Sequence, residues 1–151
     1  MQISAKADYA VRALVELAGA GGGPLKGERL ATSQDLPAKF LEGILARLRQ
    51  QGIISSRRGS DGGYWLARPA GLITLADVIR ATDGPLASVR GLRPEDVSYA
   101  GTAVRLSEVW LAVRASLRTV LEHVTIADVA VGPLPDVVSQ MLRQPGARDT
   151  R

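Results

Sequence analysis

The sequence predicts a mainly α-helical fold that contains one small β-hairpin. Apolar residues recur every three or four positions over residues 4–19, 37–51 and 106–124, which is the period of an amphipathic helix. A glycine-rich turn over residues 59–63 lies between two short strand-like runs, which is typical of a hairpin with a longer loop. At 151 residues, the chain has the length of about one domain.

The first part of the chain supplies two helices joined by a turn. The helix expected over residues 4–19 ends at "GAGGGP", residues 19–24, because glycine and proline interrupt helices. A shorter helix is expected over residues 26–33, and "SQDLP" forms the turn that follows it. Pro37 fits the first position of the next helix, because the N–H that proline lacks has no helical partner there.

The helix expected over residues 37–51 divides its side chains between two faces. The apolar face consists of Phe40, Leu41, Ile44, Leu45 and Leu48, and the opposite face of Lys39, Glu42, Gly43, Ala46 and Gln50, with Arg47 and Arg49 at the flanks. A glycine inside a helix costs about 1 kcal/mol relative to alanine. Its presence on the outward face indicates that this face lies close to another molecule. Gly52 supplies the C-terminal cap.

The strand-like runs "IISSRR" (53–58) and "YWLA" (64–67) follow directly. Helix, turn, helix and hairpin, in this order, are the parts of a winged helix-turn-helix domain. In such a domain the second helix of the pair enters the major groove, and the hairpin, called the wing, reaches the flanking backbone or minor groove. We expect this domain to span residues 1–84.

The second half of the sequence predicts a long helix and two further helix starts. "TLADV" (74–78) and "TIADV" (125–129) each place an aspartate three residues after a threonine, which is a capping-box pattern. Between them, apolar side chains alternate spacings of four and three, as in a coiled coil. This seam consists of Leu106, Trp110, Val113, Leu117, Val120 and Val124.

Such a seam has two interpretations. The helix either docks on its own domain or packs against the same helix of a second chain. We favour the second, a homodimer, because a winged helix gains much from binding two half-sites. The expected organisation is then a loop over residues 85–102, a dimerisation helix with a short following helix over 103–131, and a partly disordered C-terminal tail over 132–151.

Positive charge is concentrated in one short stretch. Residues 39–58 contain five lysines and arginines against Glu42 alone, and the whole chain carries a formal net charge of +4. A clustered basic stripe is the electrostatic footprint of a nucleic-acid-binding protein. A solvated charged face is the alternative interpretation.

Composition excludes several kinds of site. The absence of cysteine rules out disulfides, thiolate metal sites and cysteine nucleophiles. The single histidine, His123, lies near the end of the expected long helix, where its charge complements the helix dipole. No catalytic constellation is present, so we expect no enzymatic activity and no metal or other cofactor. The charged start "MQISAKADYAVR" and the lack of a long apolar run argue against a signal peptide or a membrane span, and predict a cytoplasmic protein.

The order of these parts resembles the Rrf2 family of bacterial transcription regulators. The most specific match is "RGSDGGYWLARP"; further matches are "ADYAVRALVELA", "KFLEGILARLRQQGIISS", "ITLADVIRATDG" and "VWLAVRASLRTVLEHVTIADV". The resemblance implies a homodimeric winged-helix regulator that binds a near-palindromic operator in double-stranded DNA. Repression of transcription is the expected effect.

The family's DNA contacts carry over residue by residue. Glu42 matches a glutamate that accepts a hydrogen bond from a cytosine amine. Lys39 stands where the family favours a small hydroxyl residue, and either guanine or a phosphate is its expected partner. Together with basic and wing-tip neighbours, the residues expected at the DNA are Pro37, Lys39, Phe40, Glu42, Arg47, Arg49, Arg57, Arg58, Gly59, Ser60 and Tyr64.

The chain departs from the family in its sensing half. Many members hold an iron–sulfur cluster through three cysteines in the loop before the long helix, whereas the loop over residues 87–103 contains none. Asp8 matches a cluster-ligand position of some members, but alone it cannot hold a cluster, and an acid in a first helical turn also stabilises the helix. We therefore expect a regulator without a cluster. Two alternatives are a winged-helix module for protein–protein contacts and a regulator that also binds a small organic effector.

Overall fold

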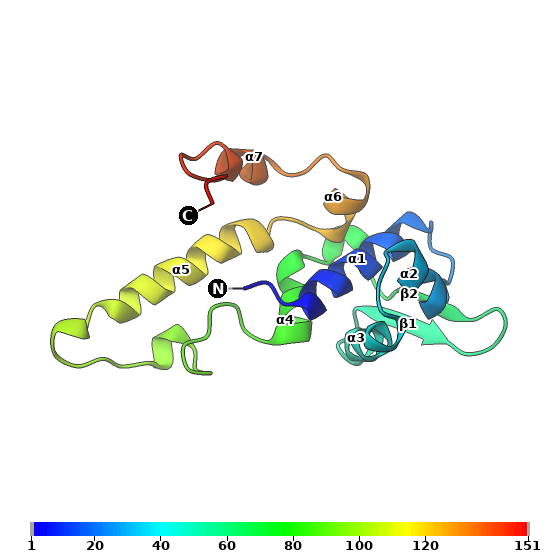
Figure 1. The fold of residues 1–151 in the computed structure, drawn as a ribbon, viewed down its shortest axis with the longest axis horizontal. Helices are drawn as coiled ribbons and strands as arrows, with labels where there is room; N and C mark the ends of the chain where they lie inside the picture. The colour runs from blue at the N-terminus through cyan, green and yellow to red at the C-terminus, as the bar shows by residue number, and fades with distance from the viewer. Residues whose placement is uncertain (1, 151) are drawn as a thin grey trace.

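The computed structural model describes residues 2–150 and has an elongated shape (Figure 1). One end holds the helix-turn-helix, the two-stranded hairpin and three further helices packed around a shared core. From this end, which we call the body, a long helix and the loop before it extend in the opposite direction from the hairpin. The mainly helical fold with a single antiparallel hairpin confirms the predicted fold class.

Helix α1, Ala5–Gly19, runs through the centre of the body. Its start is fixed by Ser4, whose Oγ accepts a hydrogen bond from the amide of Ala7 at 3.0 Å. Its buried face consists of Ala7, Ala10, Ala13, Leu14 and Leu17. The small alanines on this face let the neighbouring helices approach closely, so α1 packs against α3, α4 and the final helix of the body, α6.

The helix-turn-helix is formed by α2, Gly27–Ser33, and α3, Ala38–Gln50. Pro37 is the residue before the first turn of α3 rather than inside it, because its ψ of 113° is extended. The core face of α3 consists of Leu41, Ile44, Leu45 and Leu48. Burying each such side chain stabilises the fold by about 1.5–3 kcal/mol.

The prediction that Phe40 lies on the core face of α3 is wrong. The side chain is 45% exposed, because it lies at the margin of the apolar stripe rather than at its centre. It packs edge-on against Tyr9 of α1, with ring centroids 5.7 Å apart. Phe40 therefore belongs to the surface shared by α1 and α3.

The hairpin consists of β1, Ile54–Arg57, and β2, Gly63–Leu66, paired antiparallel. These strands agree with the predicted runs to within one residue at each end. A third segment, not predicted, pairs with the hairpin. Leu25 and Tyr64 exchange two backbone hydrogen bonds, of 2.9 and 2.8 Å, which attach the start of α2 to β2.

Two capped helices complete the body. Helix α4, Leu75–Asp83, and helix α6, Ile126–Val131, both have the predicted capping boxes, at Thr74 and Thr125. These two threonines form an antiparallel bridge, so the chain returns to the body after the long helix. The side chain of Ile126 is fully buried in the same core as α1 and α3.

The long helix α5, Leu106–Leu121, has no buried residue and exposes several apolar side chains, among them Val109 and Leu111. The predicted seam extends beyond the end of α5, and the structure corrects the prediction at the last seam residue. Val124 lies after the end of α5 and is 3% exposed, because it packs into the body. The other five seam residues are half-buried.

The remaining elements are short. Two turns of 3-10 helix, Pro94–Asp96 and Gly101–Ala103, lie in the loop before α5. A third, Ala70–Leu72, follows the hairpin. Helix α7, Asp136–Leu142, lies within residues 132–151, for which the sequence predicted only a partly disordered tail.

Candidate nucleic-acid interface

The outer face of α3 is exposed and carries polar side chains. Pro37, Lys39 and Glu42 are all exposed. A Cβ added at Gly43 would have no atom within 4 Å, so no neighbouring group covers the middle of the face, and the glycine itself adds no side chain there. The face therefore presents a cation and a carboxylate beside a surface without side chains, which suits close approach to base edges in a groove.

Two glycines allow close backbone contacts at the base of the wing, Gly63 with Leu25 and Gly62 within the hairpin. At Gly63, φ is +145° and an added Cβ would lie 2.6 Å from the carbonyl oxygen of Leu25. At Gly62, an added Cβ would lie 2.0 Å from the carbonyl oxygen of Arg57. Only glycine fits these positions without moving the backbone. The base of the wing is thus fixed by backbone contacts, while its tip, including Gly59 and Ser60, is exposed.

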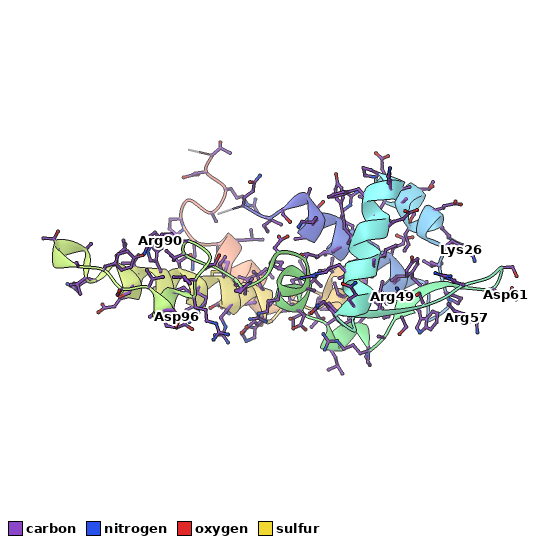
Figure 2. All side chains as sticks on the ribbon, turned by 90° about the horizontal axis from the view of Figure 1, so that it is seen from below. Lys26, Arg49, Arg57, Asp61, Arg90 and Asp96 are labelled. Carbon is purple, nitrogen blue, oxygen red and sulfur yellow. The ribbon has the colours of Figure 1, made fainter. Side chains whose placement is uncertain are left out.

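A hollow between α2, α3 and the wing gathers four cationic side chains. Its volume is about 350 Å³, and its lining includes Lys26, Arg49, Arg57 and Arg58. No aspartate or glutamate lines it. Figure 2 shows Lys26, Arg49 and Arg57 along the hairpin, with Arg49 on α3 and Asp61 at the wing tip. We call this the basic hollow.

Hydrogen bonds orient the cations of the basic hollow. Lys26 Nζ donates to the carbonyl oxygen of Gly59. Arg49 donates to Ser56 Oγ at 3.2 Å, and Arg57 donates to the carbonyl oxygen of Asp61 at 3.3 Å. Each of these groups has further N–H donors. Several cations held without a neutralising carboxylate form a surface that attracts phosphates.

The structure thus brings together Arg49, Arg57, Arg58, Gly59 and Tyr64 from the predicted set, all lining the basic hollow. The phenol ring of Tyr64 is only half-exposed, because it packs against the core and beside Gly27. Ser60 lies on a second hollow of the wing, with a volume of about 360 Å³.

Arg47 lies apart from this group. Its Nε donates to the carbonyl oxygen of Ala81 at 3.0 Å. This bond satisfies a carbonyl near the end of α4 and ties α4 to α3. Arg47 therefore has a partner within the chain, which its position at the flank of an expected helix did not reveal.

Lys26 is the site residue that sequence reasoning missed. It lies 33 positions before Gly59, and only the pairing of Leu25 with Tyr64 brings it to the wing. The sequence does place a basic residue directly before the short second helix, next to an apolar residue that can pair as a third strand. Neither feature points to the wing unless the pairing register of the hairpin is known.

The described part of the chain offers no donor set for a metal cluster. In residues 2–150, no group of three or more histidine, cysteine, aspartate or glutamate side chains is placed to hold a metal ion. The carboxylate of Asp8 forms an ion pair with Arg12 at 3.5 Å. His123 Nδ1 lies 3.0 Å from the carbonyl oxygen of Thr119, one helical turn away. Thiolates are the usual ligands of iron–sulfur clusters, and these residues do not replace them.

Comparison with known proteins decides the family. A model named Rrf2, described as "Iron-dependent Transcriptional regulator", matches residues 3–132. The chain belongs to the Rrf2 family. A protein of Mycobacterium tuberculosis named "Putative HTH-type transcriptional regulator Rv1287" is 51% identical over 142 residues, which cover 93% of this chain and 88% of Rv1287. CymR of Bacillus subtilis is 33% identical over 131 residues, covering 86% of this chain and 90% of CymR.

Solved structures of Rrf2 regulators agree. The structure of CymR, titled the global cysteine regulator of B. subtilis, superposes with a TM-score of 0.72 at 33% identity, covering 86% of this chain and 96% of CymR. The structure of T. potens IscR gives a TM-score of 0.69 at 32% identity, covering 85% of each chain.

These Rrf2 relatives are helix-turn-helix transcriptional regulators, so the chain is a DNA-binding regulator of transcription and not an enzyme, as the sequence predicted. Among residues 2–150, no helix combines the length and apolar character needed to span a bilayer.

Proposed function

We propose that this Rrf2 protein is a sequence-specific repressor that binds a near-palindromic operator as a homodimer and holds no iron–sulfur cluster. The basic hollow is the observation that carries this proposal. It places four cations between the recognition helix α3 and the wing, with no carboxylate in the lining. Like charges gathered without a neutralising acid match the phosphates of a DNA backbone, so the hollow favours DNA over a protein partner.

In this proposal, the two parts of the site have different roles. The outer face of α3 enters the major groove, where Glu42 accepts a hydrogen bond from a cytosine amine and Lys39 contacts guanine or a phosphate. The wing and the basic hollow hold the adjacent phosphates, which fix register and supply most of the non-specific affinity. Phe40 extends the contact surface at the start of α3.

An apolar groove beside α5 supports the homodimer. It has a volume of about 490 Å³ and is lined by Ile3, Ile79, Leu117 and Val120, among others. Two of these, Leu117 and Val120, belong to the predicted seam. The apolar side chains of a second copy's α5 match this surface. Repression then follows because a dimer that occupies an operator excludes other proteins from it.

Arg58→Ala tests the role of the wing. We expect it to weaken binding to specific and random duplexes alike, and to reduce the slope of log affinity against log salt by about one. The measurement is a titration by fluorescence anisotropy between 50 and 200 mM salt, where wild-type affinity itself falls steeply. Arg148→Ala, which removes the same charge from the C-terminal segment, is the control. A slope equal to the wild type's for Arg58→Ala would remove this arginine from the phosphate contacts.

The cluster-free proposal predicts a colourless protein. Without a cysteine in the chain, a dimer offers no thiolate for iron, and carboxylates such as that of Asp8 suit harder metals. We expect anaerobically purified protein to contain no stoichiometric iron and sulfide, and its DNA affinity to be indifferent to oxygen and to iron chelators. Elemental analysis and a visible absorption spectrum test this. A stoichiometric chromophore would contradict it.

A further inference from the structure

A second cluster of arginines lies outside the DNA-binding face. It lines a cavity of about 460 Å³ between α4, the loop before α5 and α5 itself. The four arginines are Arg80 of α4, Arg93 of the loop, and Arg114 and Arg118 of α5. Pro85 and Leu86 form an apolar part of the same wall. We call this the arginine cavity.

Two carboxylates neutralise part of this charge. Glu122 accepts hydrogen bonds from Arg80 and from Arg118, the second at 2.9 Å. Glu95 pairs with Arg114 at 2.5 Å. Hydrogen bonds from Arg80 and Arg118 lower the pKa of Glu122. The pKa of Glu95 is lowered by a hydrogen bond from its own backbone, then by Arg114 and, to a smaller extent, by the charge of Arg93. Both acids are therefore ionised at neutral pH.

A surplus of positive charge remains in the arginine cavity. Four guanidinium groups face two carboxylates, and the ion pairs among residues 2–150 give Arg93 no carboxylate within pairing distance. Guanidinium groups bind carboxylates and phosphates through paired N–H donors. The volume lies in the range of about 300–1,000 Å³ that is usual for small-molecule sites.

We propose that the arginine cavity binds a small organic anion that carries a carboxylate or a phosphate, and that this anion is the effector of the regulator. The anionic group binds Arg93 and the free donors of Arg114, and the hydrocarbon part contacts Pro85 and Leu86. The effector role rests on the proposed DNA-binding function, whereas binding of the anion to the free protein does not.

The position of the cavity connects the anion to both functional parts. Arg80 precedes Ala81, whose carbonyl oxygen accepts the hydrogen bond from Arg47 of the recognition helix α3. Arg114 and Arg118 lie on α5, which carries the proposed dimer seam. An anion that draws α4, the loop and α5 together binds one arrangement of these elements better than another. A ligand with such a preference shifts the affinity for DNA, and DNA shifts the affinity for the ligand equally.

The test uses two probes on the full-length protein. Succinate supplies carboxylates and glycerol 3-phosphate supplies a phosphate; succinamide and potassium chloride at matched ionic strength are the controls for charge and salt. Binding is measured by calorimetry and by the shift in Tm without DNA. We expect at least one probe to bind and to raise Tm beyond the chloride control, while succinamide does neither. Whichever probe binds identifies the anionic group.

Arg93→Gln is the decisive variant, with Arg148→Gln as a control that removes the same charge elsewhere. Arg93 is exposed, so an unchanged Tm without anion would verify that the variant folds. We expect Arg93→Gln to weaken anion binding about tenfold or more, and Arg148→Gln to leave it unchanged. The bound anion should change operator affinity for the wild type and for Arg148→Gln, but not, at the same anion concentration, for Arg93→Gln.

Three results would overturn the proposal. The first is that neither probe binds beyond the chloride control. The second is that Arg93→Gln binds the anion as tightly as the wild type does. The third is that Arg93→Gln weakens DNA binding in the absence of anion, which would assign the cavity to DNA binding. If the protein binds the anion but no duplex, the effector role fails together with the proposed function, and the anion site stands.

Discussion

Leu117→Asp is expected to convert the protein from a dimer into a monomer and to weaken operator binding about a hundredfold or more. Leu117 lines the apolar groove beside α5 and is half-buried in the single chain. A second α5 packed there would bury it completely, and an aspartate would then place an unpaired charge in an apolar interface. Loss of the dimer removes the second half-site contact, which is why the effect on DNA binding is large.

Thr119→Asp is the matched control for this prediction. It adds the same charge to the same helix, but Thr119 is exposed and does not line the groove. We expect this variant to remain dimeric and to retain nearly all operator affinity. Light scattering at micromolar concentration measures the oligomeric state, and anisotropy with the operator duplex measures affinity. A Leu117→Asp protein that stays dimeric would exclude this groove from the interface.

Gly63→Ala is expected to lower the free energy of unfolding by about 3 kcal/mol, through positive-φ strain and a backbone clash. The new Cβ would lie 2.6 Å from the carbonyl oxygen of Leu25, and the backbone there has φ of +145°. The clash separates Leu25 from β2, and it displaces both Lys26 and the wing. We therefore expect weaker DNA binding in addition to lower stability.

Gly43→Ala is the control for the glycine substitution itself. An added Cβ at Gly43 meets no atom within 4 Å, and alanine is favoured over glycine inside a helix by about 1 kcal/mol. This variant is expected to unfold at higher urea concentration than the wild type. Urea unfolding of both variants measures the two effects. Equal stability of Gly63→Ala and wild type would contradict the close contact between the wing and Leu25.

Local patterns were sufficient to predict most elements of this fold. Thr74 and Thr125 begin helices with capping boxes because the side-chain and backbone groups involved lie within four residues of each other. The hairpin was predictable for the same reason, since its strands are joined by a short glycine-rich turn. The recognition helix α3 followed from the period of its apolar residues.

Contacts between distant segments were not predictable in this way. Lys26 meets the wing only through the pairing of Leu25 with Tyr64, and Arg47 meets α4 through a carbonyl 34 positions away. Val124 continued the seam by spacing, but the chain has left α5 and entered the core at that point. The arginine cavity likewise combines residues from three segments, none of which is unusual alone.

Selection of preferred sites from random duplexes tests the central claim most directly. The account predicts that the wild-type protein enriches a near-palindrome whose half-sites are about one helical turn, or a near multiple, apart. Glu42→Ala should enrich the same spacing but relax the preference at one base pair in each half-site, worth about 1–3 kcal/mol. A selection that enriches no sequence, or a single half-site without its partner, would contradict the account, and an unchanged preference for Glu42→Ala would remove Glu42 from the readout.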